Sequence, residues 1–161
     1  MKNRATVLVS ILGCLVLATS AIAANPDFSG TWVLNTDKGR NLGMVKAVSE
    51  TATINQTPEK VVIDFATTFM LKTTNRKVTY DLAGKPVPNE GAMGDKAETV
   101  ARWDNGKLVV TWTSEGAVAG SRTVKTETRT LSADGKSMTV ENVRAGKDTM
   151  ELVYDRKVAD K

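Results

Sequence analysis

The feature that most constrains the fold is an alternation of apolar and polar residues with a period of two, which runs through nearly the whole chain after Ser49. Such alternation places apolar side chains on one face of a β-strand and polar side chains on the other. Short connections that contain glycine or proline separate the runs, at residues 57–59, 104–106, 133–135 and 145–146. Strands joined so tightly must be antiparallel, and glycine permits the positive φ angles of tight hairpins. The chain is therefore predicted to be an all-β meander.

Nine strands are expected from this pattern, at residues 28–35, 51–57, 60–67, 76–82, 97–103, 107–115, 121–131, 137–143 and 148–157. Residues 37–48 are expected to hold one or two helical turns, and residues 86–95 to form a long loop. A meander with one apolar face must curl into a barrel or fold into a sandwich, and a barrel removes the exposed sheet edges. We predict a single antiparallel up-and-down β-barrel of about 8–10 strands with at most a short helix.

Charged residues alternate with Val and Thr between residues 123 and 130. Because ionised side chains are rarely buried, Lys125, Glu127 and Arg129 are expected to face water. Thr126 and Thr128 are then expected to face the barrel interior. A three-residue loop at 133–135 would place Thr128 opposite Val140, in agreement with that assignment.

The turn near Asn105 and Gly106 allows two registers. A two-residue loop places Trp103 opposite Leu108 and turns Trp103 inward, whereas a three-residue loop turns Arg102 inward. Burying a tryptophan costs less than burying an arginine, so the first register is favoured.

The stretch Gly30-Thr31-Trp32 on the first expected strand resembles the signature of the lipocalins and their wider group, the calycins. More of the chain resembles an exported bacterial lipocalin-like family, in the segments DFSGTWVLN, ARWDNGKLVVTWT, VKTETRTLSADGKSMTVE and ELVYDRK. The resemblance implies that Trp32 plugs the closed end of the barrel and that Gly30 lets the chain pass nearby. It also implies that Arg156, on the last strand, lies across the indole ring. It names no ligand.

The first 23 residues are predicted to be a signal peptide, followed by one lipocalin-like domain at residues 24–161. Lys2 and Arg4 precede an apolar run from residue 5 to 22, and Ala21-Ile22-Ala23 supplies small residues for cleavage. The mature protein is then exported, to the periplasm or the medium, without a transmembrane segment. A retained membrane helix and a lipid anchor at Cys14 are the less favoured alternatives.

The amino-acid composition excludes several kinds of chemistry. The chain has no histidine, and its only cysteine is Cys14, within the predicted signal peptide. Nucleophilic catalysis by Ser-His or Cys-His pairs and zinc sites built from thiolate or imidazole are therefore excluded, and no metal or cofactor is expected. Removal of Lys2 and Arg4 lowers the excess of basic over acidic residues from four to two. Since both signs are interspersed, nucleic-acid binding is not expected.

A small barrel either fills with side chains or holds one small ligand. The expected interior mixes apolar with polar residues, as small-molecule sites do. The cavity candidates are Gln56, Phe65, Tyr80, Trp103, Trp112, Thr126, Thr128, Asn142 and Tyr154. The favoured hypothesis is a carrier or sensor of a small, largely apolar molecule, while a dry, filled barrel remains open.

Two other classes of function are carried as alternatives. A cofactor-free enzyme of the calycin type would use Tyr80, Tyr154, Arg102 and Glu98, although the favoured register turns Glu98 and Arg102 outward. An interaction module of the cell envelope would act through the loop at residues 86–94.

Overall fold

The structure, a computed structural model, describes residues 25–158 of the chain, so the predicted signal peptide and Cys14 lie outside the described residues. Ten strands and one short 3-10 helix follow each other along these residues. Their bounds are β1 Gly30–Leu34, η1 Gly43–Ala47, β2 Ser49–Gln56, β3 Lys60–Phe69, β4 Lys72–Asp81, β5 Val87–Glu90, β6 Lys96–Asp104, β7 Lys107–Glu115, β8 Arg122–Leu131, β9 Ser137–Arg144 and β10 Met150–Arg156.

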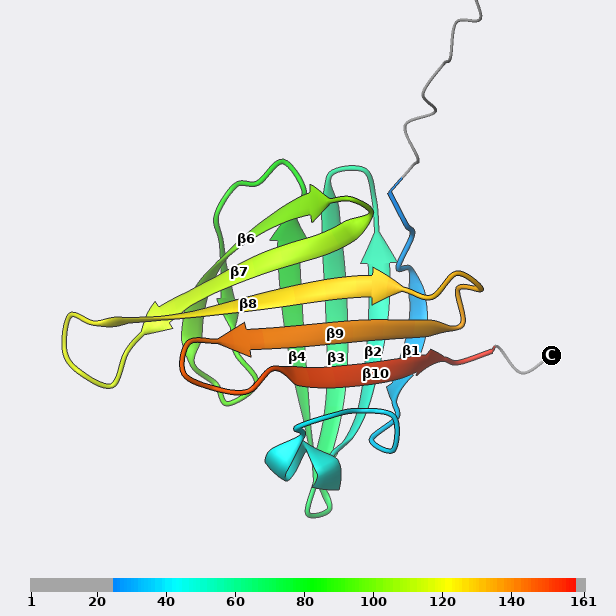
Figure 1. Cartoon of the computed structure of the whole chain (residues 1–161), viewed down its shortest axis with the longest axis horizontal. Helices are drawn as coiled ribbons and strands as arrows, with labels where there is room; N and C mark the ends of the chain where they lie inside the picture. The colour runs from blue at the N-terminus through cyan, green and yellow to red at the C-terminus, as the bar shows by residue number, and fades with distance from the viewer. Residues whose placement is uncertain (1–24, 159–161) are drawn as a thin grey trace, which may run out of the picture.

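The ten strands form one antiparallel sheet in the order β4-β3-β2-β1-β10-β9-β8-β7-β6-β5. The first strand pairs with both β2 and β10, so that Trp32 lies opposite Ala52 on one side and Arg156 on the other. The sheet curls until β4 approaches β5, and β6–β10 cross in front of β2–β4 (Figure 1). This confirms the predicted all-β barrel of about 8–10 strands, and β5 is the strand that the nine expected ones did not include.

The barrel is nearly closed, and a side chain bridges the remaining seam between β4 and β5. The Asn89 side chain accepts a hydrogen bond from the Thr79 amide N–H (2.9 Å) and donates one to the Thr79 carbonyl (2.8 Å). Asn89 thus replaces the backbone pairing that a strand would supply at this position. The prediction that residues 86–95 form a loop was partly wrong, because β5 lies there. Pro86 and Pro88 had obscured the strand pattern.

Two local predictions are confirmed. Trp103 pairs with Leu108 across a two-residue turn, so Trp103 and not Arg102 faces the interior. The segment 37–48 contains the short helix η1. The third and fourth strands are longer than expected and meet at the turn Met70-Leu71, which carries none of the usual turn residues.

The predicted orientation of β8 was wrong. Glu127 and Arg129 are 6% and 3% exposed, whereas Val124 is 50% exposed. The loop between β8 and β9 has four residues, closed by a hydrogen bond from the Ser132 N–H to the Ser137 carbonyl, and this places Arg129 opposite Val140. Because side chains alternate, Thr126 and Thr128 face the outer wall and not the interior.

The interior is lined by the inward rows of all the long strands. The buried core contains Phe28, Trp32, Leu34, Ala52, Ile54, Val61, Ile63, Phe65, Val78, Tyr80, Ala97, Ala101, Leu108, Val110, Trp112, Met138, Val140 and Tyr154. No helix within residues 25–158 is long and apolar enough to cross a bilayer.

Candidate functional site

One end of the barrel is closed by Trp32, which is fully buried. Its indole N–H donates to the Phe28 carbonyl (2.8 Å), and the Arg156 guanidinium lies 4.2 Å from the ring centroid. The same guanidinium donates to the Gly135 and Ser29 carbonyls. A Cβ atom at Gly30 would lie 2.7 Å from Arg156 Nη1, which explains why a glycine occupies this position. The predicted arrangement of these three residues is confirmed.

Two of the predicted cavity residues lie at this closed end. The Gln56 amide accepts from the Phe28 N–H and donates to the Pro26 carbonyl, so its hydrogen bonds fasten the segment that precedes β1. The Trp103 ring stacks on Phe28 with ring centroids 6.0 Å apart. Both residues therefore contribute to the packing of the closed end.

Deeper in the barrel, five side chains form an interior polar cluster: Tyr80, Trp112, Lys125, Glu127 and Arg129. The last three come from alternate positions of β8 and therefore share its inner face. Glu127 Oε1 accepts from Arg129 Nη2 (2.5 Å) and from the Tyr80 hydroxyl (3.3 Å), and Lys125 Nζ lies 3.8 Å from Glu127 Oε2. Lys125 also sits 4.5 Å from the centroid of the Trp112 ring.

Burial and charge act in opposite directions on this cluster. Burial disfavours the ionised form of Glu127, but Arg129 and Lys125 outweigh that effect and hold the pKa of Glu127 below its usual range. Burial also lowers the pKa of Lys125 and raises the pKa of Tyr80. Tyr80 is thus a neutral phenol at neutral pH. Lys125 and Arg129 are basic and Glu127 is the single acidic residue among them, so one positive charge remains uncompensated.

Two hydrogen-bond donors in the cluster have no partner. Within the described part of the chain, Arg129 Nε and Trp112 Nε1 are buried and make no hydrogen bond. Both atoms carry N–H groups and cannot accept. Leaving a buried donor unsatisfied costs about 1–3 kcal/mol, so an acceptor placed against these atoms would be favoured.

A second polar contact lies between β10 and β2. The Tyr154 hydroxyl donates to Glu50 Oε1 (2.6 Å), and the Thr67 hydroxyl donates to Glu50 Oε2 (2.7 Å). Burial, together with the Glu50 charge, raises the pKa of Tyr154 well above its usual range. Glu50 therefore accepts hydrogen bonds from side chains of two strands, β10 and β3, and Tyr154 stays protonated.

The structure brings five of the predicted cavity residues into the barrel, all of them nearly buried: Phe65, Tyr80, Trp112, Asn142 and Tyr154. Sequence reasoning missed the charged members of the interior, namely Lys125, Glu127, Arg129 and Glu50. The pattern Lys-x-Glu-x-Arg carried the missed signal, because opposite charges two residues apart on a strand neutralise each other on the same face.

The residues of the enzyme alternative are not gathered together. Glu98 and Arg102 face the outer wall, as the favoured register predicted, whereas Tyr80 and Tyr154 face the interior. The two phenols serve different carboxylates, Glu127 and Glu50.

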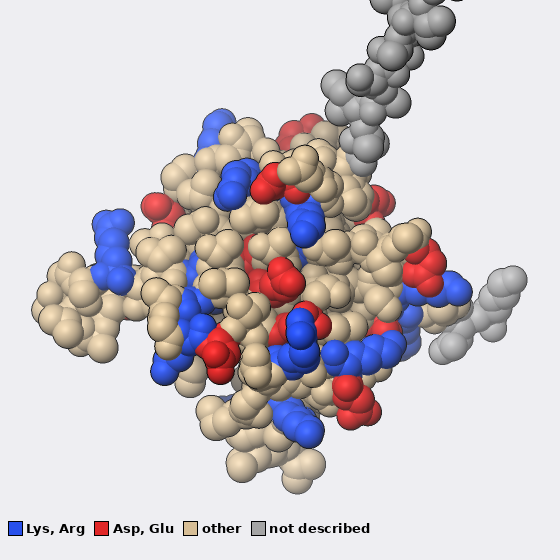
Figure 2. Space-filling view, viewed as in Figure 1, with Lys and Arg blue, Asp and Glu red and all other residues tan. Residues whose placement is uncertain are grey.

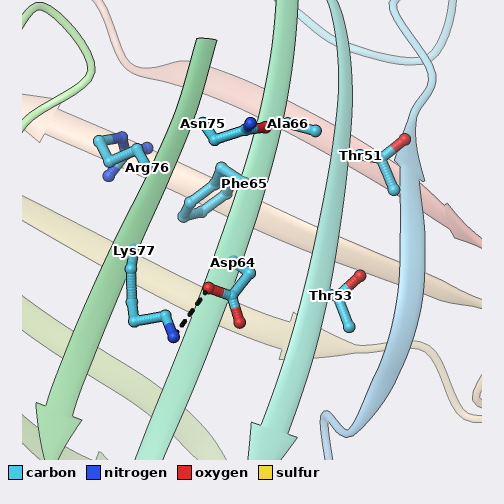
Figure 3. A pocket seen from close by; sticks show the side chains of 8 residues that line it. All are labelled: Thr51, Thr53, Asp64, Phe65, Ala66, Asn75, Arg76 and Lys77. Carbon is cyan, nitrogen blue, oxygen red and sulfur yellow. Dashed lines mark ion pairs between the residues drawn. The ribbon is translucent and has the colours of Figure 1, made fainter.

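Two surface hollows lie apart from the interior polar cluster. One, of about 400 Å³, lies over β2–β4 beside the ion pair of Lys77 with Asp64, whose Nζ and Oδ1 atoms are 3.3 Å apart (Figure 3). The other, of about 1200 Å³, runs along the seam between β4 and β5 towards β7 and β8. Neither is lined by a residue of the cluster. Basic and acidic side chains are intermixed over the face formed by β6–β10 (Figure 2).

No protein-family model and no curated protein matches the chain. Solved structures do match. A fatty acid transporter, REP1-NXSQ, is 17% identical, with a TM-score of 0.63 over 82% of this chain and 97% of its own. The fatty acid binding protein of Schistosoma mansoni, solved with arachidonic acid, is 18% identical, with a TM-score of 0.64 over 81% and 96%. Human cRBP IV is 17% identical, with a TM-score of 0.62 over 82% and 99%.

The barrel has the same fold as these proteins, a lipocalin-like β-barrel. At these levels of identity the likeness concerns the fold, and each ligand belongs to the protein that was solved with it.

Proposed function

We propose that this protein is an exported carrier or sensor that holds a small, largely apolar molecule with one acceptor head group inside the barrel. The observation that carries the proposal is the pair of unpartnered donors, Arg129 Nε and Trp112 Nε1, within a buried cluster that keeps one positive charge. Carboxylate and carbonyl oxygens are the acceptors that such donors lack, while the aromatic and aliphatic rows of the interior would contact the apolar body.

Access to the cluster is supported by partial exposure on one side of it. The Lys125 side chain is 27% exposed, and Leu152, which packs against the core, is also half-buried. The closed end offers no such access, because Trp32 and Phe28 are fully buried there. A ligand would therefore enter from the end of the barrel that carries η1, with its head group leading.

Export is supported by the pattern of the first 23 residues. Purification of the native protein from its own cell envelope, followed by mass spectrometry under non-denaturing conditions, tests both parts of the proposal. We expect cleavage after Ala23 and a bound small molecule with an apolar body. An intact N-terminus would contradict export. A protein that purifies without a bound small molecule, and that binds neither a long-chain fatty acid nor the corresponding hydrocarbon, would contradict carriage.

A displacement assay with a fluorescent long-chain fatty acid tests the role of the donors. Trp112→Phe keeps an aromatic, though smaller, ring and removes the N–H, so we expect affinity for the acid to fall about tenfold. Affinity for the corresponding hydrocarbon should hardly change. Trp103→Phe, at the closed end, is the matched control and should bind like the wild type. Equal affinities for acid and hydrocarbon in the wild type would refute the role assigned to the two donors.

A further inference from the structure

The turn between β3 and β4 exposes large apolar side chains without packing them against anything. Met70 and Leu71 are 82% and 101% exposed, and Phe69 is 39% exposed. Met44 in η1 is 76% exposed. Since Ser49, two residues after η1, pairs with Thr68, the helix and the turn lie at the same end of the barrel (Figure 1).

The backbone conformation of this turn does not favour the residues that occupy it. Met70 and Leu71 have φ angles of 46° and 64°, and Phe69 pairs with Lys72 across them. A two-residue turn with two positive φ angles favours Asn-Gly, because other side chains meet the backbone there. Two large apolar residues therefore occupy positions that their conformation disfavours, and they gain no buried surface in return.

One lysine directly follows the turn and another lies in η1. Residues 42–49 and 68–75 contain Lys46 and Lys72 and no acidic residue. In Figure 2 the end of the molecule formed by η1 and this turn shows mainly uncharged side chains with a basic one beside them. A small apolar apex flanked by lysines has the chemistry that an anionic bilayer surface attracts, since the lysines meet the head groups and the apolar side chains enter the acyl boundary.

We propose that Met44, Lys46, Phe69, Met70, Leu71 and Lys72 form a membrane-docking tip that inserts its apolar side chains into anionic lipid. A protein partner would need a pocket shaped to the apex of a hairpin, whereas a bilayer accepts a projecting apex directly. The tip lies at the end where Lys125 and Leu152 are partly exposed, so docking would present that end to the membrane. The proposal goes beyond ligand carriage and stands without it.

Co-sedimentation of the purified protein with vesicles tests the tip. We expect binding to vesicles of phosphatidylglycerol, weak binding to phosphatidylcholine and a loss of binding as salt rises. Met70→Asn with Leu71→Gly supplies a better turn while removing the apolar apex, so the partition coefficient should fall at least tenfold in a protein that folds at least as well. Lys46→Gln with Lys72→Gln should lower it about twenty-five-fold, because each lysine contributes about fivefold near such a surface.

Val158→Ser is the matched control, because Val158 is 81% exposed beyond β10, at the opposite end. It should bind like the wild type. The proposal is overturned if the wild type ignores anionic vesicles, or if the Met70→Asn and Leu71→Gly variant binds as well as the wild type. It is also overturned if the wild type is a dimer in solution that this variant converts to a monomer, since the tip would then join two copies.

Discussion

Two turns of the barrel have nearly the same backbone and very different sequences. Asn105-Gly106, between β6 and β7, has φ angles of 48° and 76°, and Met70-Leu71, between β3 and β4, has φ angles of 46° and 64°. Asn-Gly is the pair that this turn prefers, and Met-Leu is disfavoured in it. The first turn lies at the end closed by Trp32, and the second lies at the other end. Folding therefore accounts for the residues of the closed end more fully than for those opposite.

The interior shows the same contrast. At the closed end the aromatic rings of Phe28, Trp32 and Trp103 are packed together, and the indole N–H of Trp32 has a partner. In the interior polar cluster, Arg129 and Trp112 each keep an unpartnered N–H. At the closed end the indole N–H of Trp32 has a hydrogen-bond acceptor within the protein, whereas the interior polar cluster has two N–H groups without an acceptor.

The largest effect is expected at the closed end. Trp32→Ala should lower the free energy of unfolding by about 3–5 kcal/mol, because the change leaves a cavity at a fully buried aromatic. Urea unfolding followed by circular dichroism measures it. Val33→Ala, at the neighbouring position whose side chain is 38% exposed, is the control and should cost less than about 1 kcal/mol. Similar losses for the two variants would show that the closed end is not a packed plug.

A somewhat smaller effect is expected in the interior polar cluster. Glu127→Gln should cost about 3 kcal/mol at neutral pH, because it leaves Arg129 buried beside a neutral amide. The folded pKa of Glu127 is below its unfolded value of about 4.3, so the ion pair stabilises fully above that value. This stability is lost as the pH falls through the lower, folded pKa.

Urea unfolding between pH 7 and pH 2 would show this loss in the wild type and a flatter profile in Glu127→Gln. Glu141→Gln, exposed on the outer wall of β9, is the matched control and should keep the wild-type profile. If the two variants have the same pH dependence, Glu127 is not ionised in the folded barrel.

Arg156→Ala should cost about 2 kcal/mol, less than Trp32→Ala. It removes the contact with the indole ring and the hydrogen bonds to the Gly135 and Ser29 carbonyls. Since the two side chains touch, their losses should not add, and a double-mutant cycle should show a coupling of at least about 0.5 kcal/mol. Additive losses would show that Arg156 does not stabilise the closed end through Trp32.

Most of the fold was predictable because alternation and turn chemistry act locally. Trp103 was assigned inward because burying a tryptophan costs less than burying an arginine, and the pairing with Leu108 confirms it. Gly30, Trp32 and Arg156 were placed by resemblance to the calycins and by the shared parity of their strands. The turn at Met70-Leu71 was missed because nothing in its sequence favours a turn.

The interior polar cluster was not predictable by the rule that charged residues face water. That rule fails on β8 because Lys125, Glu127 and Arg129 compensate one another and find Tyr80 on another strand. The spacing of the three charges on β8 is present in the sequence, but the contact with Tyr80 of β4 is not. One additional loop residue between β8 and β9 then reversed the assignment of Thr126 and Thr128.

The smallest effects are expected from exchanging the residues of the two turns. Met70→Asn with Leu71→Gly should raise the free energy of unfolding by about 1 kcal/mol, because both positive φ angles then carry residues that tolerate them. Asn105→Met with Gly106→Leu should lower it by at least as much, since Gly106 has a φ of 76° and the turn closes the strand that holds Trp103.

Urea unfolding of the two double variants, measured beside the wild type, decides the matter. Opposite signs of the two changes in the free energy of unfolding would establish that Asn105-Gly106 suits the stability of its turn and that Met70-Leu71 does not. If Met70→Asn with Leu71→Gly destabilises the protein, the two apolar side chains must make contacts that strengthen the fold. Met70 and Leu71 would then be explained by stability, and the contrast between the two ends of the barrel would disappear.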